Sequence, residues 1–133
     1  MKLKLETVKI KKPDDLNVII GQAHFIKTVE DLYETLISSV PNIKFGFAFC
    51  ESSGATLVRA DGNDDELKEM AIDNALAVGA GHTFIIFIKN AFPINILNQI
   101  KMIPEVCRIF CASANSLEVV VAQSVQGRGI LGV

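Results

Sequence analysis

The chain has 133 residues, a length typical of one domain, and half of its residues are apolar while about a fifth are charged. This balance excludes a disordered chain and predicts a single packed core. The net charge of −2 at pH 7, with no tryptophan and no run of basic residues, argues against nucleic-acid binding through phosphate neutralisation.

Three further properties concern the compartment and the assembly. The three cysteines are an odd number without a pairing framework, which predicts reduced thiols and a cytoplasmic protein. The longest near-continuous apolar stretch, Phe84 to Ile88, is too short to cross a bilayer, and the N-terminus has no apolar signal core, so we expect no membrane partner. The apolar fraction is high for a lone small domain, which favours surface buried between subunits.

The first quarter of the chain predicts two strands and a helix. Residues 2–10 alternate polar and apolar side chains, and turn residues at 11–15 separate them from a short apolar run at 16–20, so we expect a first hairpin. Apolar residues then recur at helical spacing up to Val40. This pattern predicts a helix with Thr28 as its N-cap, ended by Pro41.

The middle of the chain predicts a strand pair followed by a second helix. Residues 44–50 form an aromatic strand, Glu51 to Gly54 a turn, and residues 56–59 the return strand. The acidic stretch from Asp61 to Glu66 suits the start of a helix, where the helix dipole favours negative charge. That helix should end at Gly79, because glycine readily adopts the left-handed conformation of a helix C-terminus.

The last third predicts a central strand, a third helix and two more strands. The continuous apolar run in residues 82–88 indicates a strand covered on both faces. Pro93 suits the first turn of a helix over residues 93–102, and strands follow near residues 106–111 and 117–122. The order ββαββαβαββ predicts a single α+β domain over residues 1–133 with a mixed or antiparallel sheet.

The chain ends directly after a glycine-rich apolar segment, residues 127–133, without a polar tail. A segment of this kind normally leads into further chain. We therefore expect that a C-terminal segment is missing, which an intact-mass measurement on the full-length product would test.

The strongest local signal for chemistry is Gly79-Ala80-Gly81-His82. Glycines allow the backbone to approach a ligand and turn its amides toward bound oxygens, and a neutral imidazole can attack a phosphoryl group. The negative end of the helix dipole at Gly79 opposes a phosphate, so amides, an arginine or a metal would have to offset it. The alternative is that His82 is a packed or capping histidine beside a helix end, and the motif alone favours that alternative.

Other residues carry weaker signals, each with an ordinary structural explanation. His24 ends a second Gly-to-His stretch and is a candidate base or phosphate contact, with a loop histidine as the ordinary alternative. Asp61 and Asn63 suit a ribose or Mg²⁺, yet helix capping alone explains that segment. Arg128 lies between two glycines, which suits a phosphate contact or a surface turn. The segment Ser52-Ser53-Gly54 is an ordinary turn, and neither a Walker loop nor a dinucleotide fingerprint is present.

Several blocks, in order along essentially the whole chain, resemble the adenosine-specific kinase family. They are Ser53-Gly54 through Arg59, Asp61-Gly62-Asn63-Asp64, Gly79-Ala80-Gly81-His82, Pro93 to Asn98, Pro104 to Cys111, Ala114-Asn115, and Gly127 to Val133. The resemblance implies a trimer of compact α/β subunits that binds adenosine or AMP and is phosphorylated on a histidine. The family's histidine falls on His82. Members usually continue past Gly-Val into another segment that this chain lacks.

The resemblance also implies a two-step mechanism. His82 takes a phosphoryl group from ATP or another nucleoside phosphate donor and passes it to a ribose hydroxyl of adenosine. Gly79, Gly81 and Arg128 would stabilise charge together with Mg²⁺ as a candidate metal. Asp61 is a candidate for the ribose or metal, and Asn63 and Asn115 for the base or sugar edge. A nucleoside-sensing module with a regulatory phosphohistidine, and a purely structural trimer, are the alternatives.

Overall fold

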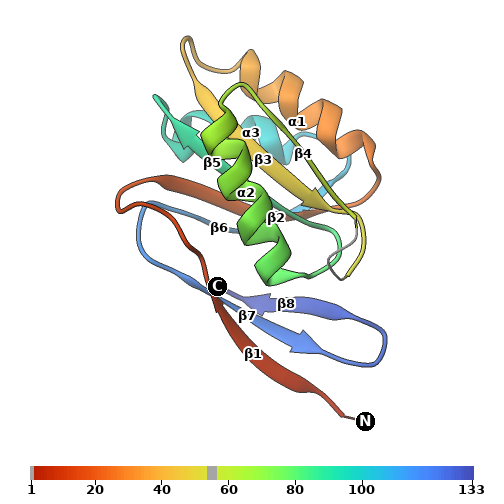
Figure 1. Cartoon of the computed structure of the whole chain (residues 1–133). Coiled ribbons are helices and arrows are strands. Elements are labelled where there is room, and N and C mark those ends of the chain that lie inside the picture. Colours follow the sequence, from red (N-terminus) through yellow and green to blue (C-terminus); the bar gives the residue numbers. More distant parts are fainter. Residues whose placement is uncertain (1, 54–56) are drawn as a thin grey trace.

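A computed structural model describes residues 2–53 and 57–133 of the chain. It contains two antiparallel sheets and three helices in the described residues (Figure 1). The strands are β1 (Lys4–Lys9), β2 (Asn17–Ala23), β3 (Lys44–Cys50), β4 (Val58–Gly62), β5 (Thr83–Lys89), β6 (Val106–Ser113), β7 (Glu118–Gln123) and β8 (Arg128–Gly132). The helices are α1 (Lys27–Ile37), α2 (Asp65–Val78) and α3 (Pro93–Lys101). The predicted α+β class and element order are confirmed, and the glycine-rich end supplies the eighth strand.

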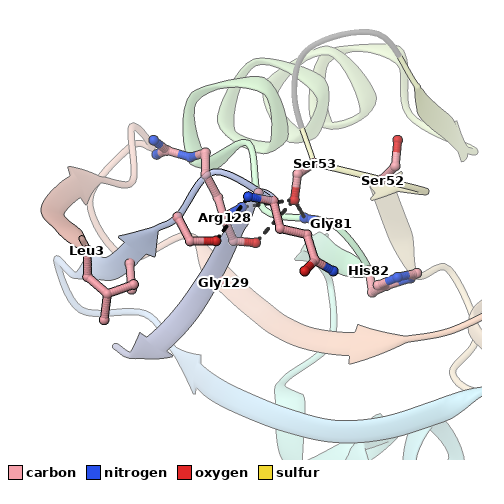
Figure 2. Close-up of a pocket in the computed structure, with 11 residues that line it drawn as sticks. Leu3, Ser52, Ser53, Gly81, His82, Arg128 and Gly129 are labelled. Carbon is pink, nitrogen blue, oxygen red and sulfur yellow. Dashed lines mark hydrogen bonds between the residues drawn. The ribbon is translucent and has the colours of Figure 1, made fainter. Parts of the chain in front are cut away.

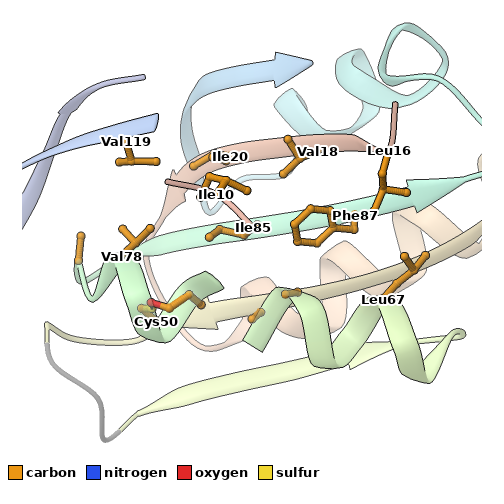
Figure 3. Close-up of a cluster of buried hydrophobic side chains, with 14 of the residues drawn as sticks. Ile10, Leu16, Val18, Ile20, Cys50, Leu67, Val78, Ile85, Phe87 and Val119 are labelled. Carbon is orange, nitrogen blue, oxygen red and sulfur yellow. The ribbon is translucent and has the colours of Figure 1, made fainter. Parts of the chain in front are cut away.

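The larger sheet has the order β4-β3-β5-β2-β6 and is covered on both faces. Side chains alternate across a strand, so Phe84 and Ile86 of β5 face α1 and α3, whereas Ile85 and Phe87 face α2 and the smaller sheet. The predicted cover on both faces of this strand is therefore confirmed. Figure 3 shows the second of these layers, in which Val119 of β7 lies across from Ile20 of β2.

Helix α2 lies directly on β3 because that strand presents small side chains to it. A Cβ on Gly46 would lie 2.1 Å from the backbone nitrogen of Lys68, so only glycine permits this approach. Ala48 of β3 and Ala71 of α2 continue the close contact in the same buried cluster. The Asp64 carboxylate caps the first turn of α2 by accepting from the Leu67 amide at 2.9 Å.

The predicted first hairpin is wrong. β1 pairs with β7, and β2 pairs with β5 and β6, so the two neighbouring strands belong to different sheets. The turn after β1 is present, but it carries the chain from the smaller sheet to the larger one. Strand alternation indicates that a strand is half buried and does not say which strand lies beside it.

The predicted boundaries of the first helix need correction at both ends, and the helix ends at Ile37, before Val40 and Pro41. Thr28 is not the N-cap of α1, because the helix begins at Lys27 and Ile26 is the capping residue. The Thr28 side chain is fully buried, and its hydroxyl donates to the Phe25 carbonyl at 2.7 Å. The left-handed Gly79 at the end of α2 (φ +62°) and Pro93 at the start of α3 are as predicted. The predicted turn at Gly54 and the strand start at residue 56 lie outside the described residues.

The three-stranded sheet, in the order β1-β7-β8, packs Val119 and Val121 against the larger sheet and α2. Its β7–β8 hairpin lies near the C-terminal end of α2, at the lower edge of the molecule in Figure 1. This arrangement brings the hairpin next to the segment between α2 and β5. In the described part of the chain, no helix is long and apolar enough to cross a membrane.

Candidate functional site

The backbone at His82 is held from both sides in an unusual conformation. Its amide donates to the Cys50 carbonyl at 2.7 Å, and its carbonyl accepts from the Ala23 amide at 2.9 Å. These bonds join the segment after α2 to the ends of β3 and β2. The residue has φ +64°, in the left-handed region that non-glycine residues adopt at an energetic cost and that often marks functional sites. The surrounding strands therefore fix the backbone from which the imidazole projects.

The imidazole of His82 stacks on that of His24, the other histidine of the chain. The ring centroids are 4.1 Å apart and the planes meet at 28°. Burial, and second the nearby His24, lower the pKa of His82 from its ordinary value of 6.5. A neutral imidazole has a free lone pair at neutral pH, which is the form that can attack phosphorus.

His24 lies in the loop that follows β2, and its ring stacks on that of His82. The His24 amide donates to the Glu105 carbonyl at 3.0 Å. The sequence signal was present in the second Gly-to-His stretch, since both histidines follow a glycine segment next to a strand end. Nothing in the sequence showed that β2 and β5 are neighbours, and their pairing brings these two ends together.

A first cavity of about 550 Å³ opens beside His82 between the β3–β4 connection and the β7–β8 hairpin (Figure 2). It is lined mostly by small and polar residues: Leu3, Ser52, Ser53, Gly81, His82, Ala122, Ser124, Gln126, Gly127, Arg128 and Gly129. The segment Ser52-Ser53 therefore does more than form a turn. It is one wall of this cavity.

Ser53 joins three segments of the chain at this cavity. Its hydroxyl oxygen accepts from the amides of Gly81 (3.2 Å) and Arg128 (3.1 Å) and lies 3.2 Å from the Arg128 carbonyl, to which it donates. Figure 2 shows Ser53 between these two residues. A Cβ on Gly81 would lie 2.8 Å from the Ser53 amide nitrogen, so glycine is required for the close packing.

The glycine amides are already used within the protein. Gly79 donates its amide to the Ala75 carbonyl, and Gly81 donates to Ser53. Both residues are at the predicted place beside His82, but in this structure they shape the loop and do not present free amides to an oxyanion. The sequence predicted glycine amides turned toward the oxygens of a ligand. In the structure, the Gly81 amide donates instead to the Ser53 hydroxyl.

Arg128 supplies the positive charge that is needed to offset the negative end of the α2 dipole. Its Nε donates to the carbonyl of Val78, the last residue of α2, at 3.0 Å. Its Nη1 donates to the Glu6 carboxylate (3.2 Å) and the Gln123 side chain (3.0 Å). The guanidinium thereby places positive charge on the negative end of the helix, next to the loop that carries His82.

A second cavity of about 380 Å³ lies on another side of His82. Its lining combines the ends of β2, β5, β6 and β8: Gln22, Gly81, His82, Thr83, Arg108, Phe110, Arg128, Gly129 and Ile130. His82, Gly81, Arg128 and Gly129 border both cavities. The imidazole is therefore accessible from two spaces.

Three of the sequence-predicted residues lie away from both cavities. Asn63 accepts from the Phe45 amide at 2.8 Å and donates to the Ile43 carbonyl at 2.8 Å, so its side-chain amide holds the start of β3. Asp61 accepts from the amide of Gly62. Asn115 lies in the turn after β6, at the end of that strand remote from His82. Of the sequence-predicted site residues, the structure brings together Gly79, Gly81, His82 and Arg128.

The residues around His82 do not fit a protein-held Mg²⁺. Neither cavity lining contains a carboxylate, and the described residues hold no group of three or more side chains suited to a metal ion. Mg²⁺ prefers carboxylate and phosphate oxygens, so these linings offer it no protein ligands of that kind.

The chain resembles known proteins over nearly its whole length. The chain matches the family model described as adenosine specific kinase over residues 8–133. It is similar to the crystal structure of the PH1918 protein from Pyrococcus horikoshii OT3, with 47% sequence identity and a TM-score of 0.94, over 98% of this chain and 81% of that chain. No curated protein matches the chain. With nearly its whole length matched by the family model, the chain belongs to the adenosine-specific kinase family.

Proposed function

We propose that this protein phosphorylates adenosine through a phosphohistidine formed on His82. The observation that carries the proposal is the position of this imidazole, which is favoured in its neutral form and borders two cavities at once. The donor is ATP or another nucleoside phosphate, and the product is AMP. Family membership supports the kinase class and the adenosine substrate.

The reaction balances in two steps. In the first, a lone pair of the neutral His82 ring attacks the terminal phosphorus of the donor, a nitrogen–phosphorus bond forms, and the bond to the leaving nucleoside diphosphate breaks. In the second, the ribose hydroxyl of adenosine attacks the same phosphorus. The nitrogen–phosphorus bond then breaks, and the hydroxyl proton passes to the released imidazole.

Arg128 supports this chemistry by offsetting the helix dipole. Without it, the carbonyl end of α2 would repel the phosphoryl group that His82 carries. Ser53 keeps the loop and the hairpin together, which holds the imidazole in place. Both are positioning residues in this proposal. Asp61, Asn63 and Asn115 remain candidates for binding adenosine through the family resemblance, and only a neighbouring subunit could bring them to this site.

The test is to incubate the protein with γ-labelled ATP, with and without adenosine, and to measure both labelled protein and AMP. His82→Asn should abolish protein labelling and AMP formation, because asparagine tolerates the left-handed conformation yet has no imidazole. His24→Asn is the matched control and should still be labelled. Labelling of the His82→Asn variant, on His24 or elsewhere, would contradict the assignment.

A second candidate function is a nucleoside-sensing module that carries a stable phosphohistidine. One observation favours it: neither cavity lining contains an aspartate or glutamate to remove the proton from the ribose hydroxyl. This candidate predicts labelled protein without AMP. A purely structural protein would not respond to adenosine, whereas a binding site adds about 2.7 kcal/mol of stability at a hundredfold excess of ligand over its dissociation constant.

We further propose that the protein is a cytoplasmic homotrimer. The outer face of the smaller sheet exposes Leu5 (64%) and Leu131 (65%), and Leu3 at its edge borders the first cavity. Exposed apolar side chains grouped on one face suit contact with another subunit. The three unpaired cysteines suit a reducing compartment.

A further inference from the structure

The larger sheet has one face that packs against α2 and the smaller sheet. At the end of β2 near His82, the side chains on this face change from apolar to polar. Ile20 of β2 lies beside Ile85 of β5 and Cys111 of β6, and this row belongs to the apolar layer. Two residues further along β2, Gln22 lies beside Thr83 and Arg108. Because residues two apart on a strand point to the same face, the polar side chains lie on the same face of the sheet as Ile20 and Ile85. They form the floor of the second cavity.

Thr83 gives this floor an unused hydrogen-bonding group. The residue is only 2% exposed and lines the cavity, and no hydrogen bond of its hydroxyl is found among residues 2–53 and 57–133. Its oxygen is not one of the fully buried side-chain atoms without a partner, which in the described residues are Nδ1 of His82 and Oε2 of Glu105. The hydroxyl therefore meets the open space of the cavity, where it can donate a hydrogen bond to a ligand.

The charge of the cavity is positive. Two of the three arginines of the chain, Arg108 and Arg128, line it together with His82, and its lining contains no acidic residue. Arg128 is already paired with Glu6. Arg108 forms no ion pair with any residue that the structure describes, so its guanidinium is the uncompensated charge of this space.

We propose that the second cavity is the subsite for the phosphate groups of the phosphoryl donor, bound by Arg108 with the Thr83 hydroxyl and the Gln22 amide as further donors. A guanidinium binds phosphate oxygens through two parallel N–H groups, and all three side chains can donate hydrogen bonds to an acceptor-only ligand. The first, less charged cavity then receives adenosine. The assignment rests on the proposed function and adds the place where the phosphates of its nucleoside polyphosphate donor bind.

The probe for this subsite is inorganic pyrophosphate, whose binding is measured by isothermal titration calorimetry. We expect Arg108→Gln to weaken pyrophosphate binding about tenfold to a hundredfold, since a hydrogen bond between charged partners is lost. Thr83→Val, which keeps the side-chain shape, should weaken it about threefold to tenfold. Arg59→Gln is the matched control, because Arg59 is exposed on β4 and lines neither cavity.

Adenosine binding and turnover separate this proposal from the proposed function. Arg108→Gln should leave the dissociation constant of adenosine within about twofold of the wild-type value and should raise the KM for ATP. Unchanged pyrophosphate binding in Arg108→Gln, or an equal loss of adenosine binding, would overturn the subsite even if AMP is formed. Arg108-dependent pyrophosphate binding without phosphorylation of His82 would support the subsite while the proposed function fails.

Discussion

His82 combines a left-handed backbone, a buried ring nitrogen and a stacked neighbour in one residue. Its Nδ1 is buried without a partner among the described residues, and the backbone bonds to Cys50 and Ala23 hold the main chain from which the ring projects. Such strain persists only where surrounding structure imposes it. At the residue scale, the site is thus a neutral imidazole held by its neighbours.

The pKa of His82 provides a test at this scale. We expect an NMR titration of its imidazole protons to give a midpoint below 6.5, because burial and His24 both disfavour the charged ring. His24→Gln should raise that midpoint, although not fully, since burial is the larger cause and remains.

The same shift sets the sign of a pH effect on stability. The unfolded chain takes up the proton of His82 at a higher pH than the folded chain does, so the free energy of unfolding falls as pH drops through 6.5 toward the lower folded value. His82→Asn should remove this part of the pH dependence. A midpoint at or above 6.5 in the wild-type protein would contradict the neutral ring.

At the scale of elements, helix α2 depends on a side chain from the far end of the chain. Asp64 caps its beginning from the adjacent residue, whereas its end receives Arg128 of β8, which donates to the Val78 carbonyl. This contact ties the smaller sheet to the helix that precedes His82. It also places positive charge at the carbonyl end of the helix, which would favour the phosphoryl group proposed on His82.

Replacing Arg128 tests the contact. Arg128→Gln should lower the free energy of unfolding by about 2 kcal/mol, because three hydrogen bonds of a largely buried guanidinium are lost and the Glu6 carboxylate loses its partner. Urea denaturation at pH 7 measures the change. Arg59→Gln breaks only the exposed pair with Glu51 and should change stability by less than about 0.5 kcal/mol, so equal effects of the two variants would refute the capping role.

At the scale of the whole molecule, the smaller sheet has two different faces. Val119 and Val121 pack inward, while Leu5 and Leu131 on the outer face are exposed. The outer face lies next to the first cavity through Leu3. A subunit that covered it would also border the place where adenosine is proposed to bind.

Assembly is tested by placing charge on that face. The wild-type protein should sediment at three times its chain mass of 14.5 kDa. The double variant Leu5→Glu, Leu131→Glu should sediment as a monomer with an unchanged circular dichroism spectrum, since both side chains are exposed in the single chain and carboxylates oppose burial in an interface. A wild-type monomer, or a charged variant that still forms trimers, would refute the proposed face.

The sequence by itself determined the local features of this protein. The two-faced burial of β5, the left-handed end of α2 at Gly79, the start of α3 at Pro93 and the Gly-Ala-Gly-His signal all depend on residues within a few positions of one another. Short-range backbone and burial preferences decide such features. For the same reason, the helices and most strands could be predicted closely.

Only the tertiary structure decided which distant segments meet. β1 pairs with β7 across more than a hundred residues, Arg128 reaches Val78, and the pairing of β2 with β5 and β6 brings His24 and Arg108 beside His82. Asn63, with the same side chain that could bind a ligand, instead holds the backbone of β3. Strand pairing depends on how the whole core packs, so the spacing of residues along the chain does not predict which strands become neighbours.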